Sequence, residues 1–294
     1  MTDPQTLILP LAAAFTYVAA ALSLKRAAEL GVGLWHTTVV SNLMAAVLFQ
    51  ALQFFGGNWP PLALWWQPLV VALLFLSGQV WGLFALQRGD VSVATPVMGL
   101  KILLVAAFTT LLLAQGLGWR LWLAAGLSTA GIAVLNHAGA HRTGAKATTT
   151  ILSAGAAAVS FALFDVLVQK WSPAWGLGRL LPLSVALVGV LSCGLIPLFP
   201  APLRSLSRPA RRWLGTGGGL MALQSLLFVS AIALYGQATV SNVVYSSRGV
   251  WSIAAVALLG HWFHSAEKDL GQSVLGRRLV GAALMFTAIV LVLV

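Results

Sequence analysis

Two cations stand deep inside apolar stretches of the sequence, where a charge either carries chemistry or must be neutralised. Lys101 and Arg248 each lie about ten residues into such a stretch, or about 15 Å along a helix at 1.5 Å per residue. A cation at that depth in a membrane costs several kcal/mol unless it is paired or faces a water-filled cavity. Two such cations suit the recognition of a carboxylate or a phosphate. The alternative is a structural role, with Lys101 snorkelling to the interface or Arg248 bonding to backbone carbonyl groups.

Asp165 is the carboxylate that we place inside an apolar stretch, at the end of residues 160–165 (SFALFD). A carboxylate there could couple protons or hold an ammonium group of a substrate. It could also act as an internal counter-ion to Arg248, or reach the interface near Lys170. Asp165 is therefore a candidate coupling or counter-ion residue.

A polar and aromatic helix face surrounds Arg248. Asn242, Tyr245 and Arg248 recur at spacings of three, so they share one face of a helix, which Ser241 or Trp251 widens. Because polar side chains inside a span turn away from lipid, we expect this face to line a cavity. The residues expected to bind substrate are Arg248, Lys101, Tyr245, Asn242, Trp251, Trp81, Gln79 and Thr95. Further candidates for the lining are Tyr17, Asn42, Gln224, Ser225, Ser246 and Ser247. The alternative is interhelical hydrogen bonding without ligand contact.

Other patterns that resemble catalytic or metal sites are incomplete. His261, His264 and Glu267 have a metal-like spacing, but no further ligand cluster accompanies them, and an interfacial loop is the better interpretation. Residues 215–219 are rich in glycine but lack the Lys-Ser/Thr that follows in a phosphate-binding loop. The acids are scattered along the chain, which argues against an intramembrane enzyme. We therefore predict no enzyme activity, no bound metal and no cofactor.

The composition excludes a soluble protein. The chain has 294 residues, of which 59% are hydrophobic and 8% are charged, and its mean hydropathy is +0.92. A soluble domain carries about 25% charged residues. The net charge of +11 lies in small clusters between apolar stretches, which predicts contact with lipid headgroups and no binding of nucleic acid. The single cysteine, Cys193, excludes an intrachain disulfide, and the first apolar stretch is expected to stay as a spanning helix.

Ten apolar stretches are long enough to span a bilayer, which needs about 20 residues. The stretches are 5–24, 34–55, 67–87, 92–114, 119–137, 149–169, 180–199, 214–235, 239–260 and 277–294. Residues 93–101 correspond to residues 240–248, because both segments open a span and both place a cation at the ninth position. Since five is odd, two units of five spans sit in opposite orientations. We predict an all-α membrane protein of two inverted five-helix repeats, residues 1–140 and 141–294.

A resemblance to a known family rests on two segments. Residues 89–96 (GDVSVATP) lead into the fourth span, and residues 125–132 (AGLSTAGI) give a glycine-rich fifth span. With five spans in each half, the chain resembles the EamA-like branch of the drug/metabolite transporter superfamily. The resemblance implies a secondary transporter with a central cavity and alternating access. One departure is Gln115, in a segment where many relatives carry a glutamate at the end of the fourth span.

The charge distribution predicts which side of the membrane each loop faces. Most of the 17 Lys and Arg residues lie in loops opposite the termini, whereas Arg120, Lys170 and Arg179 lie on the side of the termini. Cytoplasmic loops carry the excess of cations. We therefore expect a multi-pass protein of the cell (inner) membrane with both termini on the non-cytoplasmic side.

These patterns favour secondary transport of a small anionic or zwitterionic metabolite, an amino acid or an organic acid. Arg248, helped by Lys101, would hold the carboxylate at a midplane site between the repeats. One alternative is a flippase for a lipid-linked or amphipathic molecule, and the non-transport alternatives are an intramembrane enzyme or a scaffold. Besides lipid and substrate, the partners considered are a proton or another coupling ion and a second copy of the chain.

Overall fold

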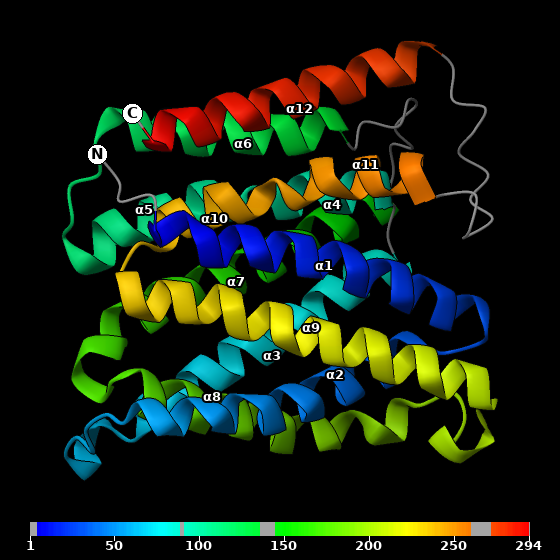
Figure 1. The fold of residues 1–294 in the computed structure, drawn as a ribbon, viewed down its shortest axis with the longest axis horizontal. Coiled ribbons are helices and arrows are strands. Elements are labelled where there is room, and N and C mark those ends of the chain that lie inside the picture. The colour runs from blue at the N-terminus through cyan, green and yellow to red at the C-terminus, as the bar shows by residue number, and fades with distance from the viewer. Residues whose placement is uncertain (1–4, 89–90, 136–144, 260–271, 294) are drawn as a thin grey trace.

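The computed structural model describes residues 5–88, 91–135, 145–259 and 272–293, which form helices and no strand. The α-helices run side by side along one direction (Figure 1). Their bounds are α1 Gln5–Glu29, α2 Leu34–Leu48, α3 Trp66–Arg88, α4 Val91–Gly99, α5 Lys101–Leu113, α6 Trp119–Leu135, α7 Ala145–Trp175, α8 Leu177–Ser192, α9 Arg208–Tyr235, α10 Ala238–Ser246, α11 Arg248–Leu259 and α12 Gln272–Leu293. Short 3-10 helices are η1 Phe49–Phe55, η2 Leu62–Leu64, η3 Cys193–Leu198 and η4 Leu203–Ser205. The predicted all-α membrane fold is confirmed.

Seven of the described helical segments are long and apolar enough to cross a membrane, and two shorter ones are apolar. They coincide with nine of the stretches picked out by hydropathy. The remaining stretch, 239–260, falls on α10 and α11, part of which lies outside the described residues. Hydropathy therefore located the helices. A segment that crosses lipid must satisfy its backbone N–H and C=O groups within itself, so an apolar stretch long enough to span forms a helix.

The order of elements in the first half of the chain recurs in the second. Each half has a long helix, a helix that ends in a 3-10 turn, a 3-10 turn followed by a helix, two short consecutive helices, and a final helix. The short consecutive helices are α4 and α5 in one half and α10 and α11 in the other. This order is compatible with two five-helix repeats, whose inverted arrangement stays a prediction. The predicted boundary at residue 140 lies outside the described residues.

Local sequence explains where several helices begin and end. Gly56 and Gly57 follow η1 with φ values of 70° and 137°, a region that residues with a Cβ rarely adopt. The α9 helix begins after Ser207, whose side chain accepts a hydrogen bond from the backbone N–H of Ala210 at 3.3 Å. These helix-ending and helix-starting residues keep the connections short, so consecutive helices lie next to one another.

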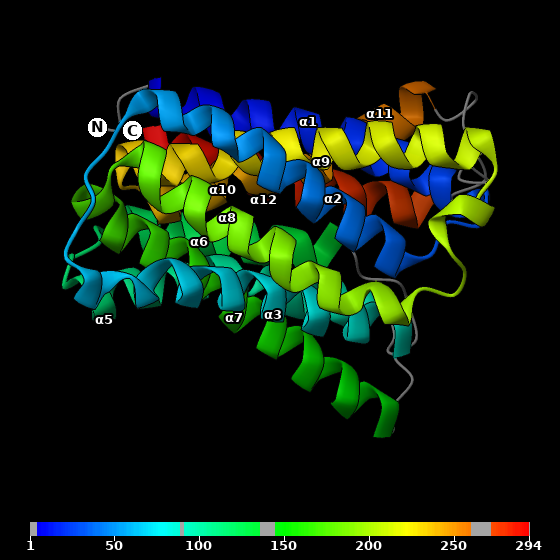
Figure 2. The same ribbon diagram turned by 90° about the horizontal axis from the view of Figure 1, so that it is seen from below.

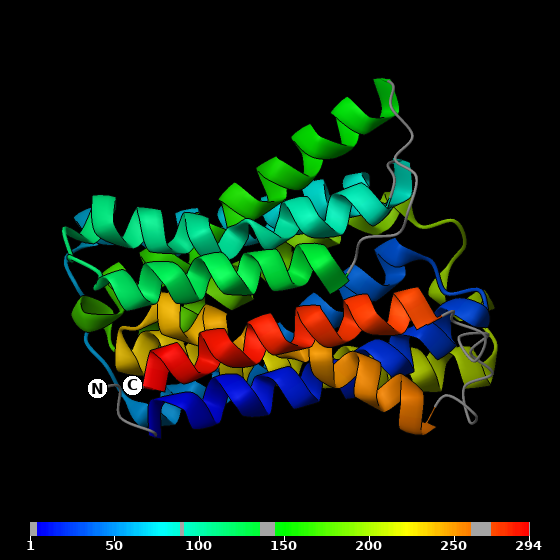
Figure 3. The ribbon, with the colours of Figure 1, turned by 90° about the horizontal axis from the view of Figure 1, so that it is seen from above.

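Both termini lie at the same end of the bundle (Figure 1). The first turns of α7 lean away from the other helices at the opposite end (Figures 2 and 3). Closer to the termini, α7 packs against α5 and α9. This part of α7 carries Asp165 into the bundle.

Candidate functional site

The two cations inside the bundle each stand at a break between consecutive helices. Lys101 is the first residue of α5, directly after α4 and Leu100, and Arg248 is the first residue of α11, directly after α10 and Ser247. The free N–H groups at a helix N-terminus carry a partial positive charge. Each cation therefore adds to a local positive potential, which an anion stabilises.

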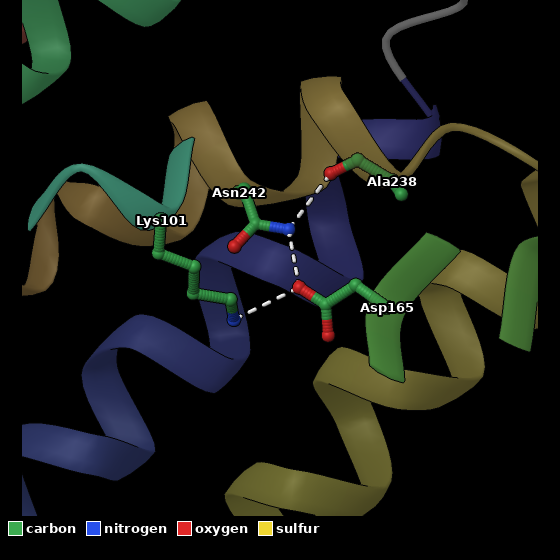
Figure 4. A network of polar contacts seen from close by, with 4 residues as sticks. All are labelled: Lys101, Asp165, Ala238 and Asn242. Carbon is green, nitrogen blue, oxygen red and sulfur yellow. Dashed lines mark hydrogen bonds and ion pairs between the residues drawn. The ribbon is translucent and has the colours of Figure 1, made fainter. Parts of the chain in front are cut away.

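Asp165 meets the first of these cations. Its Oδ2 lies 2.8 Å from Lys101 Nζ and accepts a hydrogen bond of 2.7 Å from Asn242 Nδ2, as Figure 4 shows. Asn242 also donates to the carbonyl oxygen of Ala238 at 2.9 Å. The Asp165 side chain is 1% exposed and that of Lys101 is 21% exposed, so the pair is shielded from water. The ion partner of Asp165 is Lys101 rather than Arg248, the partner considered from the sequence.

Aromatic rings complete the surroundings of Lys101. Its Nζ lies 5.3 Å from the centroid of the Phe228 ring and 5.7 Å from that of Phe161. A cation within about 6 Å of a ring centroid is attracted by the electrons of the ring face. A carboxylate and two rings therefore offset the cost of this ammonium group in the bundle.

Arg248 has a different environment. Its Cζ lies 4.5 Å from the centroid of the Tyr17 ring and 4.3 Å from that of Tyr245, so two aromatic rings flank its guanidinium. Among the residues that the structure describes, no carboxylate lies within ion-pair distance of it. A guanidinium has five N–H donors in a fork that matches a carboxylate. The guanidinium of Arg248 can therefore accept an anion.

Two polar atoms next to Arg248 lack hydrogen-bond partners. Ser247 Oγ and Trp251 Nε1 are buried and unpaired. Buried polar atoms are normally paired, so each such atom calls for a ligand or an ordered water. The Tyr245 ring contacts Arg248 and also packs on Phe228, with 4.5 Å between ring centroids, and Phe228 contacts Lys101. Tyr245 and Phe228 therefore connect the two cations. We call Lys101, Asp165, Asn242, Tyr17, Tyr245 and Arg248 the central cluster.

Four expected site residues lie outside the central cluster: Trp251, which is next to Arg248 and packs on Phe15, and Gln79, Trp81 and Thr95. Gln79 on α3 exchanges hydrogen bonds with Asn42 on α2, at 2.9 Å and 2.7 Å, and so joins two helices. Trp81 is 44% exposed and packs against Phe84. Thr95 is half-buried on α4, before the helix break.

Some residues near the cations were missed by sequence reasoning. Phe161 and Phe228 lie against Lys101, and Phe15 packs on Trp251 with 4.6 Å between ring centroids. A phenylalanine in an apolar helix looks the same whether it faces lipid, a core or a cation. Residues 261–267, with the metal-like spacing, lie outside the described residues. The described part of the chain holds no group of three metal-binding side chains.

Comparison with known proteins supports the fold and a family. Residues 5–137 match the model of the EamA-like transporter family. No curated protein matches the chain. Twenty-nine chains of solved structures do, and one of them, a crystal structure of a protein with 16% sequence identity, covers 100% of this chain and 99% of its own with a TM-score of 0.76. This likeness shows the fold alone.

Proposed function

We propose that this chain carries a small anionic or zwitterionic metabolite by secondary active transport, because residues 5–137 match the model of the EamA-like transporter family, which is part of the drug/metabolite transporter superfamily. The expected substrates are amino acids and organic acids. The site is the central cluster, and alternating access exposes it to each side in turn. The proposed location is the cell (inner) membrane, with a proton or another ion for coupling and a homodimer as the assembly to be tested.

One observation carries this proposal. Arg248 lies at a helix break inside the bundle, flanked by Tyr17 and Tyr245, with no carboxylate partner among the described residues. A guanidinium that were only structural would be expected to have a carboxylate or several carbonyl partners. The carboxylate of a substrate would supply the missing partner, and the rings of the two tyrosines would hold the guanidinium in place.

Lys101 and Asp165 have a supporting role in the proposal. Since Asp165 already neutralises Lys101, the ammonium group is released only when Asp165 takes up a proton or when a second anion displaces it. Proton uptake by Asp165 would make Lys101 a second donor for the substrate. This exchange of partners is how an ion gradient would be coupled to substrate binding.

Ligand binding to purified protein tests the site. Thermal unfolding of the detergent-purified chain is measured with amino acids, organic acids, phosphorylated metabolites and lipid precursors, because a ligand that binds only the folded state raises its stability. The same screen is run on Arg248→Gln and on Arg212→Gln, a matched control that removes an exposed cation near the start of α9. We expect stabilisation by a carboxylate-bearing solute in the wild type and in the control, and a clearly smaller stabilisation in Arg248→Gln.

Uptake of the identified solute into proteoliposomes completes the test. Wild type and Arg212→Gln should accumulate it, and Arg248→Gln should not. Stabilisation that is as large in a folded Arg248→Gln protein as in the wild type would contradict the proposed site. Stabilisation by lipid precursors alone would favour flipping of a lipid-linked molecule instead.

A further inference from the structure

A polar pocket lies away from the central cluster. It has a volume of about 360 Å³ and opens between α5, α6, α7, α10 and α12, at the end of the bundle where both termini lie (Figure 1). Its polar lining residues are Thr109, Gln115, Arg120, Gln169, Gln237 and Thr239. We call it the terminal pocket. None of the six residues of the central cluster lines it.

Three oxygen atoms of the terminal pocket's lining residues lack hydrogen-bond partners. They are the hydroxyl oxygens of Thr109 and Thr239 and Oε1 of Gln237. Thr109 is 2% exposed and Thr239 is 3% exposed, so bulk water does not satisfy them. More than nine in ten buried polar groups are normally paired. Three unpaired oxygens around one pocket indicate that a polar molecule completes it.

The charge around the terminal pocket favours an anion. Ala238, Thr239 and Val240 line it and form the first turn of α10, a helix of nine residues. The N-cap residue Gln237 makes no side-chain hydrogen bond to this turn, and Gln169 Oε1 accepts only from the Ala238 N–H. The free N–H groups of such a turn attract negative charge. Arg120 adds a full positive charge, and the described lining contains no acid.

Hydrogen bonds connect the terminal pocket to the central ion pair. Gln169 Nε2 donates to Gln115 Oε1 at 3.0 Å, and Gln169 Oε1 accepts from the Ala238 N–H at 2.8 Å. The carbonyl oxygen of Ala238 then accepts from Asn242, which also donates to Asp165 (Figure 4). A ligand that moves the start of α10 therefore acts on the residue that holds Asp165.

The geometry points to a peripheral anion site in the terminal pocket, which takes a small carboxylate solute before it reaches the central cluster. The site is built by the first turn of α10, Arg120 and the hydroxyls of Thr109 and Thr239. The choice of a carboxylate over other small anions rests on the proposed function. Binding of an anion in the terminal pocket does not depend on Arg248.

Saturation-transfer NMR of succinate with the purified full-length protein tests this site. The variant Thr109→Val/Thr239→Val removes both hydroxyls while keeping side-chain shape. The matched control is Thr110→Val, because the Thr110 hydroxyl bonds to the Ala106 carbonyl at 3.1 Å and does not line the pocket. Thr239→Ser keeps the hydroxyl and serves as the rescue variant. Arg248→Gln isolates the terminal pocket from the central cluster.

We expect succinate to bind the wild type, Thr110→Val, Thr239→Ser and Arg248→Gln. When the two valines are introduced into the Arg248→Gln background, the affinity for succinate should fall about tenfold relative to Arg248→Gln alone, which corresponds to about 1.4 kcal/mol. Absence of a succinate signal in Arg248→Gln, or equal affinities of Arg248→Gln with and without the two valines, would overturn the terminal site. A signal in Arg248→Gln equal to that of the wild type, together with no effect of Arg248 on transport, would instead overturn the central site and leave the terminal one standing.

Discussion

The two cations meet the first helix of the opposite half of the chain, but different side chains meet them there. Lys101 contacts Asp165 on α7, whereas Arg248 contacts Tyr17 on α1. A carboxylate neutralises the first cation, and an aromatic ring leaves the second one available. We therefore expect that Tyr17→Glu supplies Arg248 with an internal carboxylate and strongly weakens substrate binding.

The size of the effect follows from the geometry. The Tyr17 ring centroid lies 4.5 Å from Arg248 Cζ, and the carboxylate of a glutamate reaches about as far from the backbone as the centre of that ring. Breaking a buried ion pair costs about 3–5 kcal/mol. Arg248 is only half-buried, so we take about 2.7 kcal/mol as the energy that a substrate must overcome, which is about a hundredfold in affinity.

Titration calorimetry with the solute found in the stability screen measures this effect. Tyr17→Gln is the matched control, because it removes the ring without adding charge. A lost cation–π contact is worth about 0.5–2 kcal/mol, so Tyr17→Gln should weaken binding about two- to thirtyfold. Thermal stability of Tyr17→Glu should match or exceed that of Tyr17→Gln. Equal affinities in the two variants would refute the idea that Arg248 is held open for an anion.

Three further outcomes are expected. A double-mutant cycle of Lys101→Met and Asp165→Leu is measured by equilibrium unfolding in mixed detergent. Lys101→Met should lower the free energy of unfolding more than Asp165→Leu, because it leaves a carboxylate that is 1% exposed without its partner, whereas Lys101 is 21% exposed. If the effects of the two changes add within about 0.5 kcal/mol, the pair is not coupled. In a Cys193→Ser background, an impermeant maleimide applied to intact cells should label a cysteine placed at Asn58 and not one at Ser207, and the reverse pattern would invert the proposed orientation. Uptake of the substrate anion into proteoliposomes should be faster when the same anion is already present inside them. An uptake rate that does not depend on the internal anion would contradict exchange of one anion for another.

The sequence was sufficient to predict where the helices lie and that Lys101 and Arg248 stand inside the bundle. Apolar stretches of about 20 residues define spans because a lipid-exposed backbone must bond within its own helix. The matched positions of Lys101 and Arg248 followed from the correspondence of residues 93–101 with 240–248, and both residues stand at helix breaks in the structure. The helix breaks themselves were not predicted, because neither Leu100 nor Ser247 is a residue type that interrupts a helix.

The pairing within the site was beyond sequence reasoning for a physical reason. Asp165 was assigned alternative partners, and Lys101 was not among them, because hydropathy and spacing give the depth of a residue but not which helices are neighbours. The same limit placed Gln79 among the expected binding residues, although its amide pairs with Asn42. Gln169 carried no signal, since its role depends on contacts with Gln115 and Ala238 from two other helices.

The charges of the central cluster bear on how the transporter moves. Lys101, Asp165 and Arg248 together carry one net positive charge, which the surrounding helices shield from water. Burying an unpaired charge is costly, so reorientation of the empty protein is opposed. A bound monoanion brings the cluster to zero and removes that cost, whereas a zwitterion leaves the net charge unchanged. We therefore propose that the loaded form would reorient more readily than the empty one, which would favour exchange of one anion for another.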